Sequence, residues 1–130
     1  MIYIDTNYFL RFLLKDSEEQ YQQAKKLILA GAEGKKKLLT SIIVIFEIYW
    51  VLSSYYGKNR SDIATTLQMI LSLEFIELNG RSTLAETVDL FSTSNFDLED
   101  CYHLTFAKNA GVADFKTFDR KLANEFSSRE

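Results

Sequence analysis

The sequence predicts a single α/β domain in which a central, mainly parallel sheet is flanked by helices. Short apolar runs of β type alternate with longer segments of helical periodicity along the 130 residues, and this alternation is typical of a parallel sheet covered on both faces. Hydrophobic residues make up 47% of the chain, which suffices for one core at this length. No stretch reads as a linker or an internal repeat, so residues 1–130 are expected to form one domain.

The first half of the chain is expected to hold two strands and three helices. A buried strand, "IYID", leads into a helix in "NYFLRFLLKD". Ser17 is the expected N-cap of the helix "SEEQYQQAKKLILAGAEG", which has acids in its first turn and glycine at its end. A short strand in "KKLLTS" then precedes the helix "IIVIFEIYWVLSSYYG", capped by Thr40 or Ser41 and ended by Gly57.

The second half is expected to continue the alternation. "SDIATTLQMILSLE" predicts a helix capped by Ser61, "FIEL" predicts a strand, and "RSTLAETVDLFSTS" predicts another helix. A helix from Asp97 to Gly111 is predicted by "DLEDCYHLTFAKNAG". "VADFKTFD" is interpreted as a further strand and "RKLANEF" as the closing helix.

The net charge and the single cysteine limit the possible partners and compartments. The formal net charge is −3, whereas proteins that bind nucleic acid through phosphate contacts alone are usually basic. Something other than bulk charge would have to hold the phosphates of a nucleic acid, and a bound metal ion is the obvious candidate. Cys101 is alone, which excludes an intrachain disulfide. No signal peptide is recognisable, and the longest apolar run, "SIIVIFEIYWVL", is too short to span a bilayer and contains a glutamate. The protein is expected to be soluble and cytoplasmic, with no membrane association.

Glu47 stands out because it lies inside "IIVIFEIYWVL", a helix that is apolar on nearly every side. Such a helix is usually buried, and a buried, unpaired carboxylate costs several kcal/mol or becomes protonated. Two interpretations remain open. Glu47 either reaches solvent or a basic partner at one edge of the helix, or it borders a polar site where a cation compensates its charge.

Asp5 and Asp119 share a different context, since each ends an apolar-rich strand and precedes a helix. In a parallel sheet both would sit at the edge where ligands bind. Helix capping is the alternative role, for which aspartate is well suited. Each has a hydroxyl residue nearby, Thr6 or Thr117, which favours a functional pair over two unrelated caps.

Asp100 is the fourth acid of interest, in "DLEDCYHL". Asp97 can cap this helix, which puts Asp100 at a capping-box spacing, and Asp97 and Glu99 are interpreted as capping and solvated acids. Asp100 also begins a helical stripe that continues with His103 and Leu104, so it points the same way as apolar residues. Converging carboxylates of this kind are the ligands that Mg²⁺ and Mn²⁺ prefer, and such ions can activate a water and stabilise a leaving oxygen.

At these residues the sequence resembles the PIN-domain ribonucleases, and most of all the VapC toxins of toxin–antitoxin pairs. The resemblance rests on four stretches that span essentially the whole chain: "IDTNYFLRFL", "IIVIFEIYWVL", "DLEDCYHLTFAKNAG" and "TFDRKL". It implies a PIN-like three-layer fold with a central, mainly parallel sheet. Asp114 and Lys116, in the last predicted strand, depart from the expected apolar run and suggest an exposed edge.

The resemblance also implies a site and an activity. Asp5, Glu47, Asp100 and Asp119 match the acidic quartet that binds Mg²⁺ or Mn²⁺, and Asn7 and Thr117 match the polar residues that support it. The implied activity is endonucleolytic cleavage of tRNA, rRNA or other RNA. The implied partners are the RNA substrate, a small antitoxin protein and a second copy of the chain, in a homodimer.

Several other features are interpreted as structural. His103 is interpreted as a helix-face histidine satisfied by a neighbour, Cys101 as a small core residue, and "EGKKKL" as a solvated turn. Arg11 could meet a phosphate or an antitoxin acid, and the aromatic residues around Trp50 could stack on bases but fit a core or subunit interface better.

Three alternatives to a toxin remain open. A phosphoacceptor or Mg²⁺-binding signalling domain would explain Asp5 but leave Glu47 and Asp100 without a role. A non-catalytic interaction module would use the acids as helix caps and would respond little to metal. An RNA-processing nuclease with the same fold would act without an antitoxin.

Overall fold

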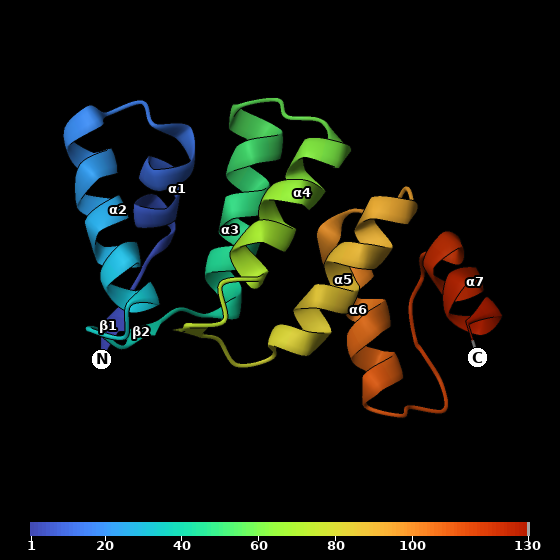
Figure 1. Ribbon diagram of the computed structural model, residues 1–130. Helices are drawn as coiled ribbons and strands as arrows, with labels where there is room; N and C mark the ends of the chain where they lie inside the picture. The colour runs from blue at the N-terminus through green and yellow to red at the C-terminus, as the bar shows by residue number, and fades with distance from the viewer. Residues whose placement is uncertain (130) are drawn as a thin grey trace.

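The computed structural model describes residues 1–129 and has a three-stranded parallel sheet flanked by helices, which confirms the predicted α/β class (Figure 1). The strands are β1 (Ile2–Tyr3), β2 (Leu38–Leu39) and β3 (Ile76–Glu77). The helices are α1 (Thr6–Leu14), α2 (Glu18–Ala32), α3 (Ile42–Trp50), α4 (Arg60–Leu71), α5 (Arg81–Thr93), α6 (Leu98–Asn109) and α7 (Arg120–Ser128), and a π-helical segment, η1 (Val51–Tyr55), extends α3.

The sheet has the order β1-β2-β3, so β1 is an edge strand. Ile2 is in register with Leu38, and Leu38 with Ile76. The amide of Ile4 donates to the carbonyl of Leu39 at 2.8 Å, and the buried hydroxyl of Thr40 donates to the carbonyl of Ile4 at 3.0 Å. These bonds fix the carboxyl end of β1, so that Asp5 follows at the edge of the sheet.

Local sequence signals account for most helix boundaries. Ser17 accepts from the amide of Gln20, as its capping role predicts. Asp97 caps α6 in the same way. The prediction of Ser61 as the cap of α4 is wrong, because Asn59 accepts from the amide of Asp62 at 2.8 Å and the helix begins at Arg60. Asparagine is as good an N-cap as serine, so the helix starts at the earlier residue.

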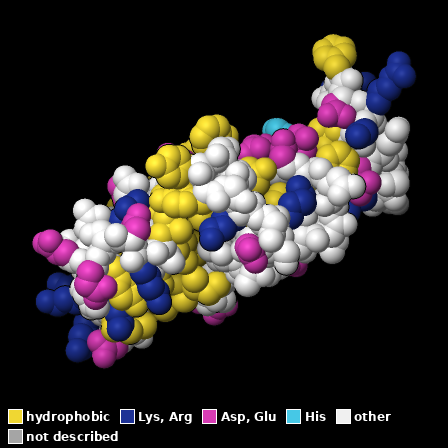
Figure 2. Space-filling model, turned by 90° about the horizontal axis from the view of Figure 1, so that it is seen from above, with side chains coloured by type: hydrophobic (Ala, Val, Ile, Leu, Met, Phe, Trp, Pro, Cys, Tyr) yellow, Lys and Arg dark blue, Asp and Glu magenta, His cyan; other side chains and the backbone are white. Residues whose placement is uncertain are grey.

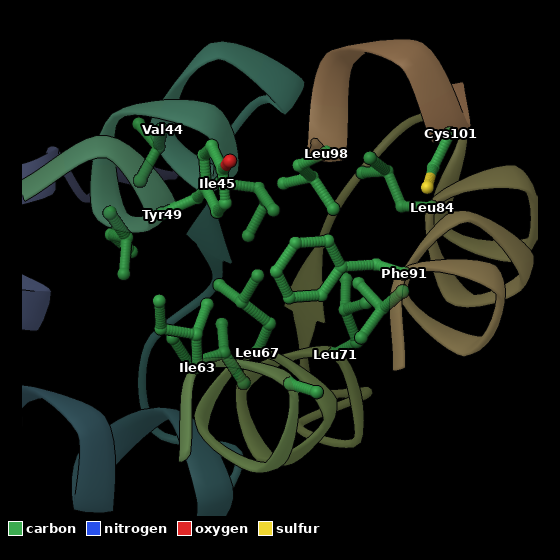
Figure 3. Close-up of a cluster of buried hydrophobic side chains, with 14 of the residues drawn as sticks. Val44, Ile45, Tyr49, Ile63, Leu67, Leu71, Leu84, Phe91, Leu98 and Cys101 are labelled. Atoms are coloured by element: carbon green, nitrogen blue, oxygen red, sulfur yellow. The ribbon is translucent and has the colours of Figure 1, made fainter. Parts of the chain in front are cut away.

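The main core lies between the four central helices, α3 to α6 (Figure 3). Phe91 is 1% exposed and meets Tyr49 edge to face, with ring centroids 5.5 Å apart. Leu67 and Leu84 are fully buried beside them. This packing is what holds α3 and α6, the two helices that carry Glu47 and Asp100. No helix within residues 1–129 is both long enough and apolar enough to cross a membrane.

The strand predicted for "VADFKTFD" is not formed, which corrects the sequence interpretation. Asp114 accepts from the amide of Phe115 at 2.8 Å and pairs with Lys116 at 2.8 Å. These local bonds offer the backbone an alternative to a sheet ladder. Phe115 stacks on Phe126 of α7, while Phe118 is fully exposed. Residues 112–118 therefore pack beside α7 and do not join the sheet.

Candidate functional site

Asp5 lies at the carboxyl end of β1 and caps α1. Its Oδ1 accepts from the amide of Tyr8 at 3.1 Å, which is the capping role that the sequence left open. A cap uses only one oxygen of a carboxylate that can accept several bonds. Asp5 is exposed, so capping leaves it able to bind a ligand at the edge of the sheet.

Glu47 is exposed on α3, so it reaches solvent at one edge of this apolar helix, as one of the two open interpretations states. Ile43 and Trp50, one turn before and one turn after it, are 59% and 62% exposed, and the opposite face of the helix holds the core. The hydroxyl of Thr6 donates to Oε1 of Glu47 at 2.8 Å. From the sequence, Thr6 is only a hydroxyl residue next to Asp5, with no predicted contact to Glu47. Its bond to Glu47 spans 41 residues and has no local sequence signal.

Asn7 is exposed on the first turn of α1, beside Asp5. Both residues line a cavity of about 190 Å³ between α1 and α2, together with Tyr8, Arg11, Gln20 and Gln23. Asn7 is therefore near enough to Asp5 to support a ligand there. Arg11 also lines this cavity, but its Nη1 is already bonded to the two carboxylate oxygens of Asp16, at 2.9 and 3.0 Å.

The carboxyl group of Asp100 lies in an acidic setting at the start of α6. Asp97 accepts from the amide of Asp100 at 2.8 Å. Partial burial raises the pKa of Asp100 above its usual value, and the nearby charges of Asp97 and Asp119 raise it further, against a smaller opposing effect of His103. Figure 2 shows acidic side chains gathered beside the single histidine. A cation would relieve this repulsion.

Asp119 caps α7, which is the alternative role that the sequence left open for it. Its carboxylate accepts from the amide of Leu122 at 3.1 Å, and its own amide donates to Oγ1 of Thr117 at 3.0 Å. Thr117 thus holds the backbone at Asp119. The expectation that Asp119 shares a sheet edge with Asp5 is wrong in this structure, because residues 112–118 form no strand and α7 lies at the opposite end of the molecule from α1 (Figure 1).

The four acids are arranged as two pairs. Asp5 and Glu47 are joined through Thr6, and Asp100 and Asp119 are close enough for one charge to raise the pKa of the other. Within residues 1–129, no three histidine, cysteine or acidic side chains are grouped closely enough to hold a metal ion. The donor chemistry suits Mg²⁺ or Mn²⁺, since all four residues offer carboxylate oxygens. Joint binding of one ion by the quartet stays a prediction.

A shallow apolar groove runs between the helices that carry Glu47 and Asp100. Glu47 lines it from α3, and Glu99 and His103 line it from α6. Its floor is aromatic, and includes Phe46 and Tyr102, whose rings meet edge to face at 5.4 Å. Burial, followed by the charges of neighbouring acids, raises the pKa of Glu99. The groove gives α3 and α6 one continuous accessible surface.

Comparison with known proteins gives two matches. A family model described as PIN domain matches residues 2–125. The VapC ribonuclease of Aquifex aeolicus (strain VF5) is 26% identical over 119 residues, which are 92% of this chain and 87% of that protein. No solved structure matches the chain significantly.

Proposed function

Since the chain belongs to the PIN-domain family, we propose that it is an Mg²⁺- or Mn²⁺-dependent RNA endonuclease that acts as the toxin of a toxin–antitoxin pair. The observation that carries this proposal is the family match over residues 2–125, which includes all four acids. The likeness to a protein named VapC ribonuclease supports RNA as the substrate and the toxin role.

In this proposal Asp5, Glu47, Asp100 and Asp119 hold the ion. A divalent cation bound by them would supply activation of the attacking water and charge stabilisation at the departing oxygen. Thr6 orients Glu47 through its 2.8 Å hydrogen bond, and Thr117 fixes the backbone at Asp119. Such supporting bonds commonly decide how well metal ligands are placed.

Bringing the two pairs of acids together is part of the proposal. The sheet has a free edge for this, because β1 is an edge strand that ends at Tyr3, two residues before Asp5. Residues 112–118 form no strand in the structure, so the two pairs of acids would meet only if the segment before α7 were rearranged to bring Asp119 toward the edge beside β1. A substrate or a partner that favours this arrangement would then complete the site.

The proposed partners are a small antitoxin and a second copy of the chain. Ile43 and Trp50 line the groove between α3 and α6, and both are more than half exposed. The exposed ring of Phe106 lies 5.6 Å from that of Tyr102 in the same groove, and exposed apolar residues that gather in this way mark interaction surfaces. An antitoxin that covered the adjoining groove would also block Glu47. The site of action is proposed to be the cytoplasm.

The test of the activity is to map the 5′ ends of cellular RNA after brief expression. The wild-type chain is expected to create new 5′ ends, and Asp5→Asn and Asp100→Asn are expected to abolish them while circular dichroism shows an intact fold. Undiminished cleavage by either variant would refute the assignment of these acids. Co-purification of a small protein from the native host distinguishes a toxin from an RNA-processing nuclease.

A further inference from the structure

The cavity between α1 and α2 has a lining that the acidic site does not explain. Asp5 forms one edge, and the rest is made by Asn7, Tyr8, Arg11, Gln20 and Gln23. Three of these side chains are carboxamides, all of them exposed, and none of the three makes a side-chain hydrogen bond within residues 1–129. They are therefore available to a ligand as donors and as acceptors.

The walls of this cavity are held firmly. Arg11 of α1 binds both carboxylate oxygens of Asp16, in the turn before α2, and this turn is set by Lys15 in the left-handed conformation. Phe12 and Tyr21 stack between the two helices with ring centroids 5.9 Å apart. Because α1 and α2 are joined at these points, Gln20 and Gln23 face the first turn of α1 before any ligand binds.

The chemistry of the lining favours a nucleobase over a phosphate. The guanidinium group of Arg11 is neutralised by Asp16 at 2.9 Å, and Asp5 adds a negative charge at the edge. Among residues 1–129, those that line the cavity therefore offer no free cation to a phosphate. A carboxamide can bond bidentately to adenine, by accepting from N6 and donating to N7. The ring of Tyr8 is 38% exposed, which leaves a face on which a base can stack.

We propose that this cavity binds an adenine base of the RNA next to the bond that is cleaved, with Gln20 and Gln23 reading the edge of the base and Tyr8 packing on its face. The proposal rests on the proposed nuclease function for its substrate class. Because Asp5 lines the same cavity, a base held there places its own sugar and phosphate beside the acidic site. The cavity then decides where along a single strand the chain cuts.

The experiment has a binding arm and a cleavage arm. In the first, the affinity for fluorescein-labelled 2′-O-methyl octamers, which resist hydrolysis, is measured by anisotropy for U8 and for U8 with one central A, C or G. In the second, cleavage positions are mapped on a randomised single-stranded RNA pool. The variants are Gln20→Ala, Gln23→Ala and the double variant. The matched control is Gln22→Ala, because Gln22 lies on the same helix, bonds to Glu18 at 2.8 Å and does not line the cavity.

The wild-type chain is expected to prefer the adenine-containing octamer and to cut beside adenine. In the double variant, the ratio of the affinity for the adenine-containing octamer to that for U8 is expected to fall by about 5- to 150-fold. In Gln22→Ala this ratio is expected to stay at the wild-type value. Tyr8→Ala should weaken binding of every octamer, and Tyr8→Phe should not, since stacking needs only the ring.

The outcomes separate this inference from the nuclease proposal. RNA cleavage with the same sequence profile in the wild type and the double variant would overturn the inference alone, and it is also the result expected of a cavity that binds a peptide. Adenine preference in binding without any cleavage would overturn the nuclease proposal alone. A wild type that neither cleaves nor discriminates would overturn both.

Discussion

The hydroxyl of Thr6 donates to Oε1 of Glu47 at 2.8 Å and so ties the first residue of α1 to the middle of α3. Thr6 follows Asp5 directly, which means that one residue couples the positions of two carboxylates from different parts of the chain. The bond holds the exposed side chain of Glu47 in one orientation toward the edge of the sheet. Without it, Glu47 would be free to turn along the apolar groove that it lines.

The first prediction concerns this bond. Thr6→Val keeps the shape of the side chain and removes the donor, so Glu47 loses its support, and the affinity for Mn²⁺ and the cleavage rate are expected to fall by about 10- to 100-fold. Mn²⁺ affinity is measured by calorimetry and cleavage with a short labelled RNA. Thr6→Ser restores a hydroxyl and should recover most of both. Equal values for Thr6→Val and the wild type would remove Thr6 from the site.

The second prediction concerns metal and charge. Because Asp100 has a raised pKa, its ionised form is disfavoured in the folded state, and at neutral pH the charge opposes folding. A bound Mn²⁺ should reverse this, and at one hundred times its Kd it would stabilise the fold by about 2.7 kcal/mol. Thermal unfolding is measured with EDTA and with millimolar Mn²⁺.

The matched variant for this experiment is Asp100→Asn. With EDTA its Tm should equal or exceed that of the wild type, because one charge has been removed from the acidic cluster. With Mn²⁺ it should lose most of the shift in Tm that the wild type gains. A wild-type chain whose Tm is indifferent to Mn²⁺ would favour the non-catalytic interaction module.

The features that the sequence predicted well are local ones. Helix periodicity and the caps at Ser17 and Asp97 depend on residues within one or two turns, and both caps are formed. Asp5 and Asp119 also cap helices as their positions indicated. The four acids could be named because each stands in a distinctive local pattern.

The features that the sequence did not predict depend on distant partners. The strand expected over 112–119 has a suitable sequence pattern, but a strand forms only when its backbone pairs with a neighbouring strand. Here Asp114 instead pairs with Lys116 and accepts from the amide of Phe115. The exposure of Glu47 depends on which face of α3 the other helices cover. Hydrophobic periodicity alone could not choose that face, because α3 is apolar all round.

The third prediction tests how closely α2 approaches the sheet. A Cβ added at Gly31 would lie 2.9 Å from Cγ of Leu38 and against its Cδ1, and Leu38 is 1% exposed on β2. In Gly31→Ala, overpacking should lower the free energy of unfolding by about 1–3 kcal/mol. The better helix propensity of alanine should offset about 1 kcal/mol of this loss. The free energy of unfolding is measured in urea.

A double-mutant cycle separates these two effects. Leu38→Ala alone should cost about 2–5 kcal/mol, and it should cost less when Gly31→Ala is present, because the added methyl group then fills the space that Leu38 leaves. Strict additivity of the two changes would mean that Gly31 and Leu38 do not press on one another.

The fourth prediction concerns Arg60, which connects α5 to the start of α6. Its Nη2 donates to the carbonyls of Phe91 at 2.7 Å and Phe96 at 2.6 Å, and its guanidinium carbon lies 3.8 Å from the centre of the Phe91 ring. Phe96 directly precedes Asp97, the cap of α6. Arg60 thus fixes the backbone from which Asp100 projects, although it touches none of the four acids.

Arg60→Met keeps much of the apolar stem and leaves two carbonyl groups without their charged donor, so it should lower the free energy of unfolding by about 2–3 kcal/mol. Because the start of α6 loosens, protection from amide hydrogen exchange should fall over residues 96–101 and stay unchanged in α1 and α2. Arg60→Lys should recover less than half of the lost stability, since one ammonium cannot reproduce the planar fork over the ring. Lys36→Met, an exposed change of the same charge, controls for net charge and should leave both measurements near wild type. Unchanged exchange at 96–101 in Arg60→Met would show that α6 is held by its core packing alone.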